Sequence, residues 1–444
     1  MKKEKIESER RHIVIIGGGF GGIATAKALK HTDADVTIID RLNHHLFQPL
    51  LYQVATAELS PGDISAPIRA IISKNPRIKV ILGEVAEISP EKKSLRMRNG
   101  QSISFDQLVM ATGAQYNYFG HGEWAEFAPG MKSISDALKV REKLLMSMEE
   151  AEQLRDSSKR KSLLTYVIIG GGPTGVEMAG AIAEIAGNGA KHGYHSIKPE
   201  DARIYLIEAG PRILNAFPES LAAKAKKMLE KMGVRVLLNT PVTNIEKNKV
   251  HLKVGSIETP NIIWAAGIKA SSLLDSLKVA QDRSGRVLVE ADLSIPQYPD
   301  IFIIGDSAHR EDKNGIPLPA LAPVATQQGK FVGKLLAKDG KRSSGSKFKY
   351  TDKGTMATIG RAKAVANIKG LKFSGFFAWF LWSFIHVLGL IGFRNRTRVF
   401  VEWIWNYFTF KRGVRLITDR SGCVYCTTYE INHKELKELQ EMPV

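Results

Sequence analysis

The sequence predicts an α/β protein built from two copies of one strand, glycine turn and helix unit, followed by a C-terminal region of different character. Three observations predict this class. Two glycine-rich turns each follow an apolar, β-branched run and precede helix-forming residues. After each turn, a second apolar run ends in an acidic residue. The last part of the chain replaces this pattern with stretches rich in Phe, Trp and Arg.

The composition is that of a globular protein with an excess of positive charge. The 444 residues are 44% hydrophobic and 24% charged, and the mean hydropathy is −0.13, which excludes a disordered chain and a polytopic membrane protein. Lys and Arg number 63 against 45 for Asp and Glu, and this net charge of +18 favours nucleic acid, acidic lipid or phosphorylated ligands. The N-terminus has no apolar segment, so we expect a protein that is not exported.

The first unit is HIVIIGGGFGG with the helix-forming residues that follow it. Gly17, Gly19 and Gly22 occupy the G-x-G-x-x-G positions. Glycine there permits a sharp turn, close approach of a pyrophosphate and tight packing of the helix on the strand. The next apolar run ends at Asp40, where a carboxylate accepts hydrogen bonds from a ribose.

The second unit, LLTYVIIGGGPTGVEMAGAIAEIA, repeats these features. Gly170, Gly172 and Gly175 lie between a strand and a helix, and the following strand ends at Glu208. The two motifs begin 153 positions apart.

A third landmark repeats at nearly the same offset. LVMATGA places Thr112 and Gly113 after a strand, and IIWAAGI places Ala266 and Gly267 after another strand, 154 positions later. Repetition at one offset predicts two Rossmann-like dinucleotide-binding units and argues against a chance glycine turn.

The N-terminal unit is the better flavin site. FIIGDSA adds a strand that ends at Asp306, and in two-dinucleotide flavoproteins an Asp at this point faces the ribityl chain. The expected domains are a discontinuous FAD-binding domain of residues 1–115 and 286–335, an NADH-binding domain of residues 116–285, and a C-terminal membrane-anchoring region of residues 336–444. The resulting fold class is that of glutathione-reductase-like flavoproteins with an added membrane-associated helical region.

Glu208 favours NADH over NADPH as the second dinucleotide. A carboxylate at this position pairs with a ribose 2′-hydroxyl and repels a 2′-phosphate. Arg212 lies four residues on, and we expect it to be a solvated loop cation.

The electron acceptor is not a protein dithiol after the flavin motif, because RLNHHLFQPLLYQVATAEL contains no cysteine. The same absence counts against sulfide:quinone reductases and peroxide-reducing relatives. Cys423 and Cys426 are the only cysteines, and we expect them to be inert. No metal site is expected.

Residues 373–393 contain no charged side chain and, as one helix, would extend about 31 Å, close to the ~30 Å hydrocarbon thickness. They are rich in Trp and Phe and are followed at once by Arg394, Arg396 and Arg398. Aromatic and basic residues together favour helices that lie in the headgroup layer, on anionic lipid. A spanning helix and a buried core or dimer contact remain alternatives.

A membrane quinone is the acceptor that this arrangement suggests. Gln327 and Gln328, in APVATQQG, are candidate donors to quinone carbonyls, although an ordinary helix start with surface glutamines explains them as well. Glu177, on the first turn after the second motif, is a candidate proton-relay or binding residue near the flavin, or simply an acid favoured by the helix N-terminus.

The chain also resembles the bacterial type II NADH dehydrogenases, which are non-pumping NADH:quinone oxidoreductases. The resemblance rests on IIGGGFGG, DRLNHHLFQPLLYQVATAELSP, ATGAQYNYFG, IIGGGPTGVEMAG, IFIIGDSA, APVATQQG, DKGTMATIGRAKAV and GFFAWFLWSFIHVLGLIGFRNR. It implies non-covalent FAD, a homodimer and C-terminal helices on the cytoplasmic leaflet. It also implies that Glu177 and Gln327 line the region where quinone and nicotinamide meet the flavin. Pro323 replaces a Gln found in some members.

The expected site residues follow from the motifs and the resemblance together. Glu177 and Gln327 are the expected catalytic residues. The residues expected to contact FAD are Gly17, Gly19, Phe20, Gly21, Gly22, Asp40, Val85, Ala111, Thr112, Gly113, Asp306, Ala325 and Gln327. Those expected to contact NADH are Gly170, Gly172, Gly175, Glu177, Glu208, Ala266 and Gly267.

The predicted function is electron transfer from NADH through FAD to a membrane quinone, without proton pumping, at the cytoplasmic face of the plasma membrane. An alternative is an NADH-dependent flavin reductase that uses another lipid-soluble or protein acceptor. A flavoprotein that binds nucleic acid is disfavoured, because the excess positive charge adjoins Trp-rich segments.

Overall fold

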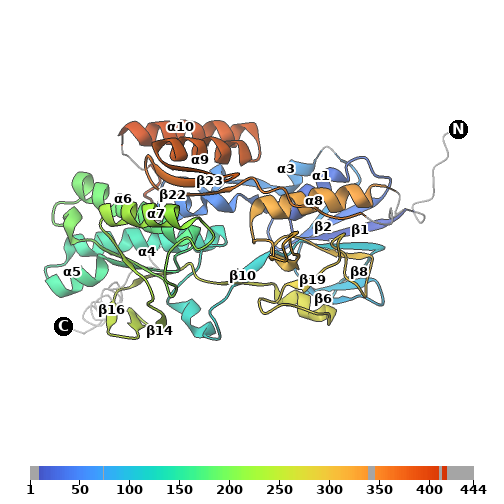
Figure 1. The fold of residues 1–444 in the computed structure, drawn as a ribbon, viewed down its shortest axis with the longest axis horizontal. Helices are drawn as coiled ribbons and strands as arrows, with labels where there is room; N and C mark the ends of the chain where they lie inside the picture. The colour runs from blue at the N-terminus through green and yellow to red at the C-terminus, as the bar shows by residue number, and fades with distance from the viewer. Residues whose placement is uncertain (1–9, 74, 339–345, 410–412, 418–444) are drawn as a thin grey trace, which may run out of the picture. The chain divides into compact units, whose positions relative to one another are not determined.

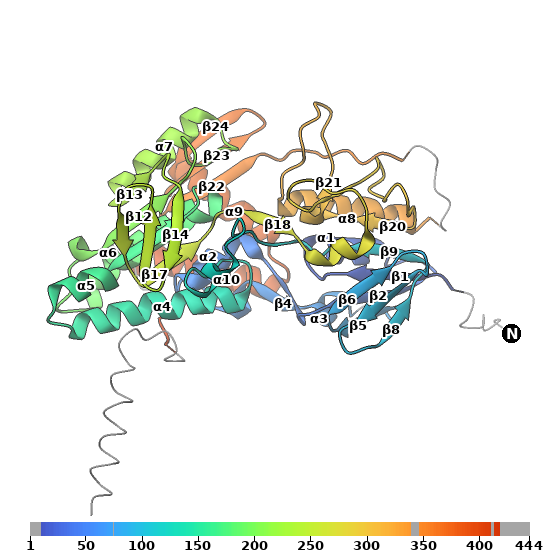
Figure 2. The same cartoon turned by 90° about the horizontal axis from the view of Figure 1, so that it is seen from below.

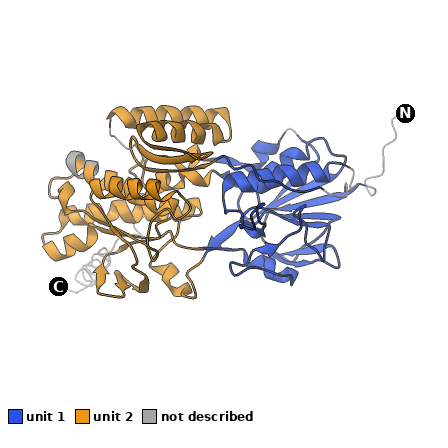
Figure 3. Cartoon of the chain, viewed as in Figure 1, with its two compact units in different colours: residues 1–46, 65–116, 268–353 blue, residues 47–64, 117–267, 354–444 orange. Residues whose placement is uncertain are grey.

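The computed structural model describes residues 10–73, 75–338, 346–409 and 413–417 (Figure 1). The chain forms two compact units, each made from separate segments (Figure 3). Unit 1 comprises residues 1–46, 65–116 and 268–353, and unit 2 comprises residues 47–64, 117–267 and 354–444. Cys423 and Cys426 lie outside the described residues.

Unit 1 is built on a parallel sheet with the strand order β20-β9-β1-β2-β5. Its strands are β1 (His12–Ile16), β2 (Asp35–Asp40), β5 (Ile78–Leu82), β9 (Gln107–Met110) and β20 (Ile301–Ile303). The central strand β1 is apolar without alternation, and Ile13, Val14 and Ile15 are fully buried. Such a run is typical of a parallel strand that is covered on both faces.

Helices α1 (Phe20–Ala28) and α8 (Ala322–Leu336) of unit 1 pack against each other (Figure 1). Glycines allow this close approach. A Cβ at Gly329 would lie 2.2 Å from the Gly21 carbonyl oxygen, and one at Gly333 would lie 2.7 Å from that of Thr25. The start of α8 is thereby fixed beside the start of α1.

Smaller elements complete unit 1. They are α3 (Ile68–Ile72), the pairs β3 (His44–Leu46) with β4 (Ser65–Pro67), β10 (Ala114–Tyr116) with β18 (Ile268–Ala270) and β19 (Val287–Leu288) with β21 (Ala308–His309), the antiparallel sheet β6 (Val85–Ser89), β7 (Ser94–Met97) and β8 (Ser102–Ser104), and the 3₁₀ turns Ser272–Leu277 and Gly305–Ser307.

Unit 2 repeats the plan of unit 1 with a parallel sheet in the order β13-β12-β11-β17, of which Figure 2 labels β13, β12 and β17. Its strands are β11 (Thr165–Ile169), β12 (Arg203–Ile207), β13 (Val234–Leu237) and β17 (Asn261–Trp264). The order matches β5-β2-β1-β9 of unit 1 strand for strand, with the glycine turn after the corresponding strand in each. The predicted fold class is therefore confirmed.

Helices and short strands surround this second sheet. They are α2 (Leu51–Ala55), α4 (Ile134–Gln153), α5 (Ser157–Leu163), α6 (Pro173–Gly193), α7 (Glu219–Lys231), the antiparallel strands β14 (Val242–Glu246), β15 (Lys249–Leu252) and β16 (Ser256–Glu258), and the 3₁₀ turns Gln48–Leu50, Pro61–Asp63, Gly122–Glu126 and Pro199–Asp201.

The C-terminal part of unit 2 is an antiparallel sheet with one helix packed on it and a second helix packed against the first (Figure 1). The sheet consists of β22 (Thr355–Gly360), β23 (Lys363–Ile368) and β24 (Leu371–Gly375), and the helices are α9 (Phe376–Gly389) and α10 (Phe393–Thr409). Helix α6 packs on β22 at Gly180, where a Cβ would lie 1.7 Å from the Ile359 carbonyl oxygen.

Residues 373–393 do not form one helix. Phe373 belongs to β24, and Gly375, with a φ of +80°, is both the last residue of this strand and the N-cap of α9. Gly392, with a φ of +88°, precedes α10. Among the described residues, no helix is both long and apolar enough to cross a membrane.

Candidate active site

The first glycine turn connects β1 to α1 in unit 1. Gly17 has a φ of +105°, and a Cβ there would lie 2.3 Å from the Ala111 carbonyl oxygen. A Cβ at Gly22 would lie 1.8 Å from the Gly17 carbonyl oxygen. A Cβ at Gly19 would meet no atom within 4 Å. Backbone atoms of the chain therefore lie against the turn at Gly17 and Gly22. The position of Gly19 is open, so that a ligand can approach the backbone there.

Asp40 closes this turn from the end of β2. Its carboxylate accepts hydrogen bonds from the backbone N–H of Gly18 at 2.5 Å and of Leu42 at 2.7 Å. A carboxylate has about four acceptor positions, so it retains capacity for ribose hydroxyls. His45 supports the turn from the other side, with Nδ1 3.1 Å from the Gly18 carbonyl oxygen and its ring edge-on to Phe20.

The second turn, in unit 2, has the same geometry. Gly170 has a φ of +112°, a Cβ at Gly175 would lie 1.8 Å from the Gly170 carbonyl oxygen, and the position of Gly172 is open. Glu208 accepts hydrogen bonds from the N–H of Gly171 at 2.6 Å and of Gly210 at 2.7 Å. The two acidic residues thus hold equivalent places in the two units.

Arg212 forms hydrogen bonds with a neighbouring residue of its own loop. Its guanidinium donates to the side-chain and carbonyl oxygens of Asn215, at 3.3 and 2.9 Å. A 2′-phosphate would have to compete with these bonds and with the Glu208 carboxylate.

The other predicted flavin residues of unit 1 converge at the ends of β9 and β20. Ser307, which follows β20, links this segment to the residues after β9. Its hydroxyl lies 2.9 Å from the Thr112 hydroxyl and donates to the Gly113 carbonyl oxygen at 2.9 Å. Ala325, in the first turn of α8, lies beside Gly305, the residue before Asp306. Val85 is instead buried in the apolar core of unit 1.

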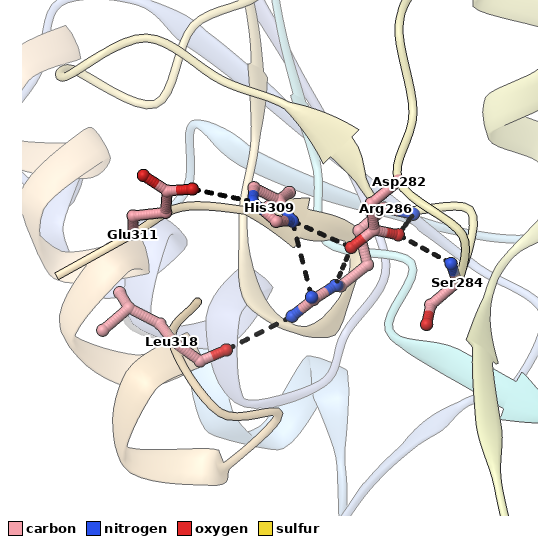
Figure 4. A network of polar contacts seen from close by, with 6 residues as sticks. All are labelled: Asp282, Ser284, Arg286, His309, Glu311 and Leu318. Carbon is pink, nitrogen blue, oxygen red and sulfur yellow. Dashed lines mark hydrogen bonds and ion pairs between the residues drawn. The ribbon is translucent and has the colours of Figure 1, made fainter. Parts of the chain in front are cut away.

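A polar network holds the chain just after Asp306 (Figure 4). Asp282 accepts hydrogen bonds from Arg286 Nε at 2.7 Å and pairs with His309 Nδ1 at 2.8 Å. Arg286 also donates to the Leu318 carbonyl oxygen at 3.3 Å. Burial opposes ionisation of Asp282, but the hydrogen bonds from His309 and Arg286 outweigh it and lower its pKa to about 2.

The two glutamines of α8 are held by backbone groups of unit 1. The side-chain carbonyl of Gln328, which is 1% exposed, accepts from the Gly305 N–H at 2.6 Å. The Gln327 amide makes a pair of bonds with the backbone of Thr351, each 3.0 Å long. A quinone would have to displace Thr351 to bond with Gln327.

Glu177 lies in the wall of a cavity within unit 2 that is formed by α2, α6, β22, α9 and α10. Burial raises its pKa to about 8, and a hydrogen bond from the backbone of Thr358 offsets only part of this. The close packing at Gly180, one turn further along α6, holds this part of the helix close to β22. The raised pKa favours the protonated form of Glu177, which is half-buried in the cavity wall.

Aromatic rings and polar side chains line the cavity together, and one buried amide joins two of the rings. Gln53 accepts from Trp403 Nε1 at 2.9 Å and donates to the Tyr52 hydroxyl at 3.0 Å. Trp382 is 2% exposed, and its Nε1 and the Ser383 hydroxyl have no hydrogen-bond partner among the described residues. Unpaired buried donors beside a neutral acid fit an uncharged ligand with carbonyl oxygens.

The outer faces of α9 and α10 are apolar and exposed. The exposed side chains repeat every four residues, at Phe376, Phe380 and Phe384 of α9 and at Phe400, Ile404 and Phe408 of α10. Such stripes are rare on the free surface of a soluble protein and mark an interaction face.

Comparisons with known proteins place the chain in a family. A family model described as pyridine nucleotide-disulphide oxidoreductase matches residues 11–329, and one described as the NDH2 C-terminal domain matches residues 353–412. The Mycobacterium tuberculosis type II NADH:quinone oxidoreductase Ndh is 40% identical over 93% of this chain and 92% of its own. The chain belongs to the type II NADH:quinone oxidoreductases.

Other similar proteins agree with this family. The type II NADH:quinone oxidoreductase of Haemophilus influenzae is 31% identical over 81% of this chain and 87% of its own. The structure of NDH2 from Plasmodium falciparum in complex with NADH shares the fold, with a TM-score of 0.85, 20% identity, and coverage of 93% of this chain and all of that one.

Several residues of this type II enzyme's candidate site were missed by sequence reasoning. His45 and Ser307 bond with backbone groups that the motifs did identify. Tyr52, Gln53 and Trp382 meet only through tertiary packing, and their one sequence signal is that they lie in segments that resemble the family.

Proposed function

We propose that this chain transfers electrons from NADH, through a bound FAD, to a membrane quinone without pumping protons. The observation that carries the proposal is the complete dinucleotide turn, with its acidic residue, in each unit. Two such sites in one chain can hold an electron carrier and its reductant. Membership of the type II NADH:quinone oxidoreductases supports the same assignment.

Unit 1 is the proposed FAD site, formed from residues 1–115 and 286–335. The first N–H groups of α1 have no side-chain cap and no acidic neighbour in the first turn, and Gly19 leaves room, which suits a pyrophosphate. Asp40 would accept the ribose hydroxyls, and Asp306 would face the ribityl chain. A flavin held there would supply the chemistry of hydride acceptance from NADH and two-electron transfer to a quinone.

Unit 2 is the proposed NADH site, within residues 116–285. The start of α6 is likewise uncapped by a side chain, and Gly172 leaves room for the pyrophosphate. Glu208 would bind the adenosine ribose, and Arg212 is already engaged with Asn215. This arrangement favours NADH over NADPH.

The cavity beside Glu177 is the proposed site of the quinone head group. Trp382 Nε1 and the Ser383 hydroxyl would donate to a carbonyl oxygen, and the aromatic rings of the lining would pack against the head group. The reaction NADH + H⁺ + quinone → NAD⁺ + quinol takes up one proton, which Glu177 holds and would deliver to a quinone oxygen. Gln327, whose amide pairs with the Thr351 backbone within unit 1, stays a predicted quinone contact.

Residues 336–444 are proposed to anchor the protein on the cytoplasmic face of the plasma membrane, as a homodimer. The apolar stripes of α9 and α10 would enter the interface, and Arg394 and its basic neighbours would meet anionic headgroups. Lipid rather than nucleic acid would then account for much of the positive charge.

The test is a steady-state assay of NADH oxidation with a short-chain quinone. We expect saturable, stoichiometric quinone reduction, with NADPH a much poorer donor. Activity only with an added protein acceptor would contradict the proposal and favour an NADH-dependent flavin reductase.

The proposed membrane anchor is tested by flotation of the protein with anionic vesicles. Replacing Phe376, Phe380 and Phe384 by Ser should release the protein, whereas replacing exposed Leu82 and Val254 by Ser should not. Equal binding of both variants would contradict the anchor assignment.

A further inference from the structure

A tight turn in unit 2 holds a phenylalanine in an unfavourable backbone conformation. The His121 N–H donates to the Tyr118 carbonyl oxygen at 3.0 Å, and the two central residues, Phe119 and Gly120, have φ values of +53° and +96°. These are the features of a type I′ turn, whose first central position favours Asn, Asp or Gly. A large aromatic residue there is a genuine outlier.

Asn117 keeps this turn in place. Its side-chain oxygen accepts from the Phe119 N–H at 2.9 Å. Its backbone N–H donates to the Gly267 carbonyl oxygen at 3.3 Å, and its carbonyl accepts from Trp264 Nε1 at 3.2 Å. The turn is therefore fastened to the end of β17.

The Phe119 ring lies on Gly267. A Cβ at Gly267 would be 2.5 Å from Phe119 Cζ, so only glycine admits the ring. The ring also contacts Trp264, with centroids 6.2 Å apart, yet 62% of the residue stays exposed. Burial within the chain therefore does not explain why an aromatic side chain is kept at this strained position.

The place of this ring in the sheet suggests what covers it. In the order β13-β12-β11-β17, Glu208 marks the adenosine ribose at the end of β12, and Gly172 marks the pyrophosphate after β11. A dinucleotide that continues in the same direction reaches the end of β17, where Gly267 and Phe119 lie. That end corresponds to the nicotinamide half.

We propose that Phe119 is a substrate-binding residue whose exposed ring packs on the nicotinamide half of the dinucleotide. The proposal rests on the proposed function, because it takes unit 2 as the NADH site. Aromatic rings stack on flat heterocycles, and the positive ring of NAD⁺ adds a cation–π attraction. The strain at Phe119 is then maintained because the site needs a rigid aromatic surface there.

The test compares NAD⁺ with ADP-ribose, which lacks the nicotinamide, as ligands of the holoenzyme in calorimetric titrations. Phe119→Asn should bind NAD⁺ about tenfold more weakly, equivalent to about 1.4 kcal/mol, and ADP-ribose as tightly as the unmodified protein. Its melting temperature should be unchanged or higher, because Asn suits a positive φ. Phe119→Tyr should retain NAD⁺ affinity, and Val254→Asn, an exposed site elsewhere in unit 2, should change neither ligand.

Two results would overturn the inference. One is an unchanged NAD⁺ affinity in Phe119→Asn, and the other is an equal loss for NAD⁺ and ADP-ribose, which would indicate a structural role. If the unmodified protein oxidises NADH, either result removes only the role of Phe119. If the unmodified protein binds neither ligand, both this inference and the proposed function are wrong.

Discussion

Replacing Glu177 by Gln should remove a pH dependence that the structure builds into unit 2. Burial raises the pKa of Glu177 from 4.5 to about 8. Below pH 4.5 the carboxyl group is protonated in both the folded and unfolded states. Between pH 4.5 and about 8 only the folded state keeps the proton, so the free energy of unfolding decreases as the pH rises. Gln is neutral throughout and lacks this decrease.

The magnitude follows from the size of the shift. Each pH unit corresponds to about 1.4 kcal/mol, so the loss reaches at most about 5 kcal/mol above pH 8. Water in the cavity would reduce this upper limit. Urea unfolding at pH 5, 7 and 9 should show the Gln variant gaining stability relative to the unmodified protein as the pH rises.

Quinone reduction provides the second measurement. If Glu177 delivers the proton, the rate should fall above pH about 8 in the unmodified protein, and Glu177→Gln should be about 100-fold slower at pH 7. Glu184→Gln changes another carboxyl group of α6 in the same cavity and should keep the pH profile. The reasoning would be refuted if Glu177→Gln and the unmodified protein had the same pH profile of stability and the same pH profile of rate.

Three further changes have defined outcomes. Glu208→Arg should raise the NADPH-to-NADH ratio of kcat/KM at least tenfold, and an unchanged ratio would refute the ribose role. Asp282→Asn should lower the free energy of unfolding in urea by about 2 kcal/mol at pH 7. Because the pKa of Asp282 is lowered to about 2, the difference between the two proteins should vanish as the pH falls from about 4 through 2. Gly180→Ala should destabilise the fold by about 1–3 kcal/mol and slow quinone reduction more than Gly187→Ala, on the same helix, where a Cβ would meet open space.

The two dinucleotide turns could be predicted because their signals are local. A glycine that must adopt φ of +105° or +112°, and an acid at the end of the next strand, are fixed by short stretches of chain. Repetition of the stretch at one offset then predicted two units of one plan, and the two sheets do share a strand order.

The surroundings of Glu177 could not be predicted in this way. The cavity joins Tyr52, Glu177, Thr358 and Trp382, which are far apart in sequence and meet only through the packing of α6 on β22. Spacing alone left open whether Glu177 was a functional residue or merely an acid near a helix N-terminus, and only its burial separates it from an ordinary surface acid.

The segment of residues 373–393 was predicted only in part. Its aromatic and basic composition favoured interfacial helices, with a spanning helix or a buried contact as alternatives. Pairing of β24 with β23 takes its first residues into a sheet, and two glycines with positive φ delimit α9. Hydropathy carries no information about a strand partner or a left-handed turn, so the residue at which the helix begins was not predicted.

The central claim is that one flavin in this chain accepts electrons from NADH and gives them to a quinone. The most direct measurement is the visible absorbance spectrum of the purified protein under anaerobic conditions. We predict a flavin spectrum that bleaches on addition of one equivalent of NADH and returns on addition of one equivalent of a short-chain quinone. A protein that binds no flavin after reconstitution, or whose flavin NADH leaves oxidised, would contradict the account.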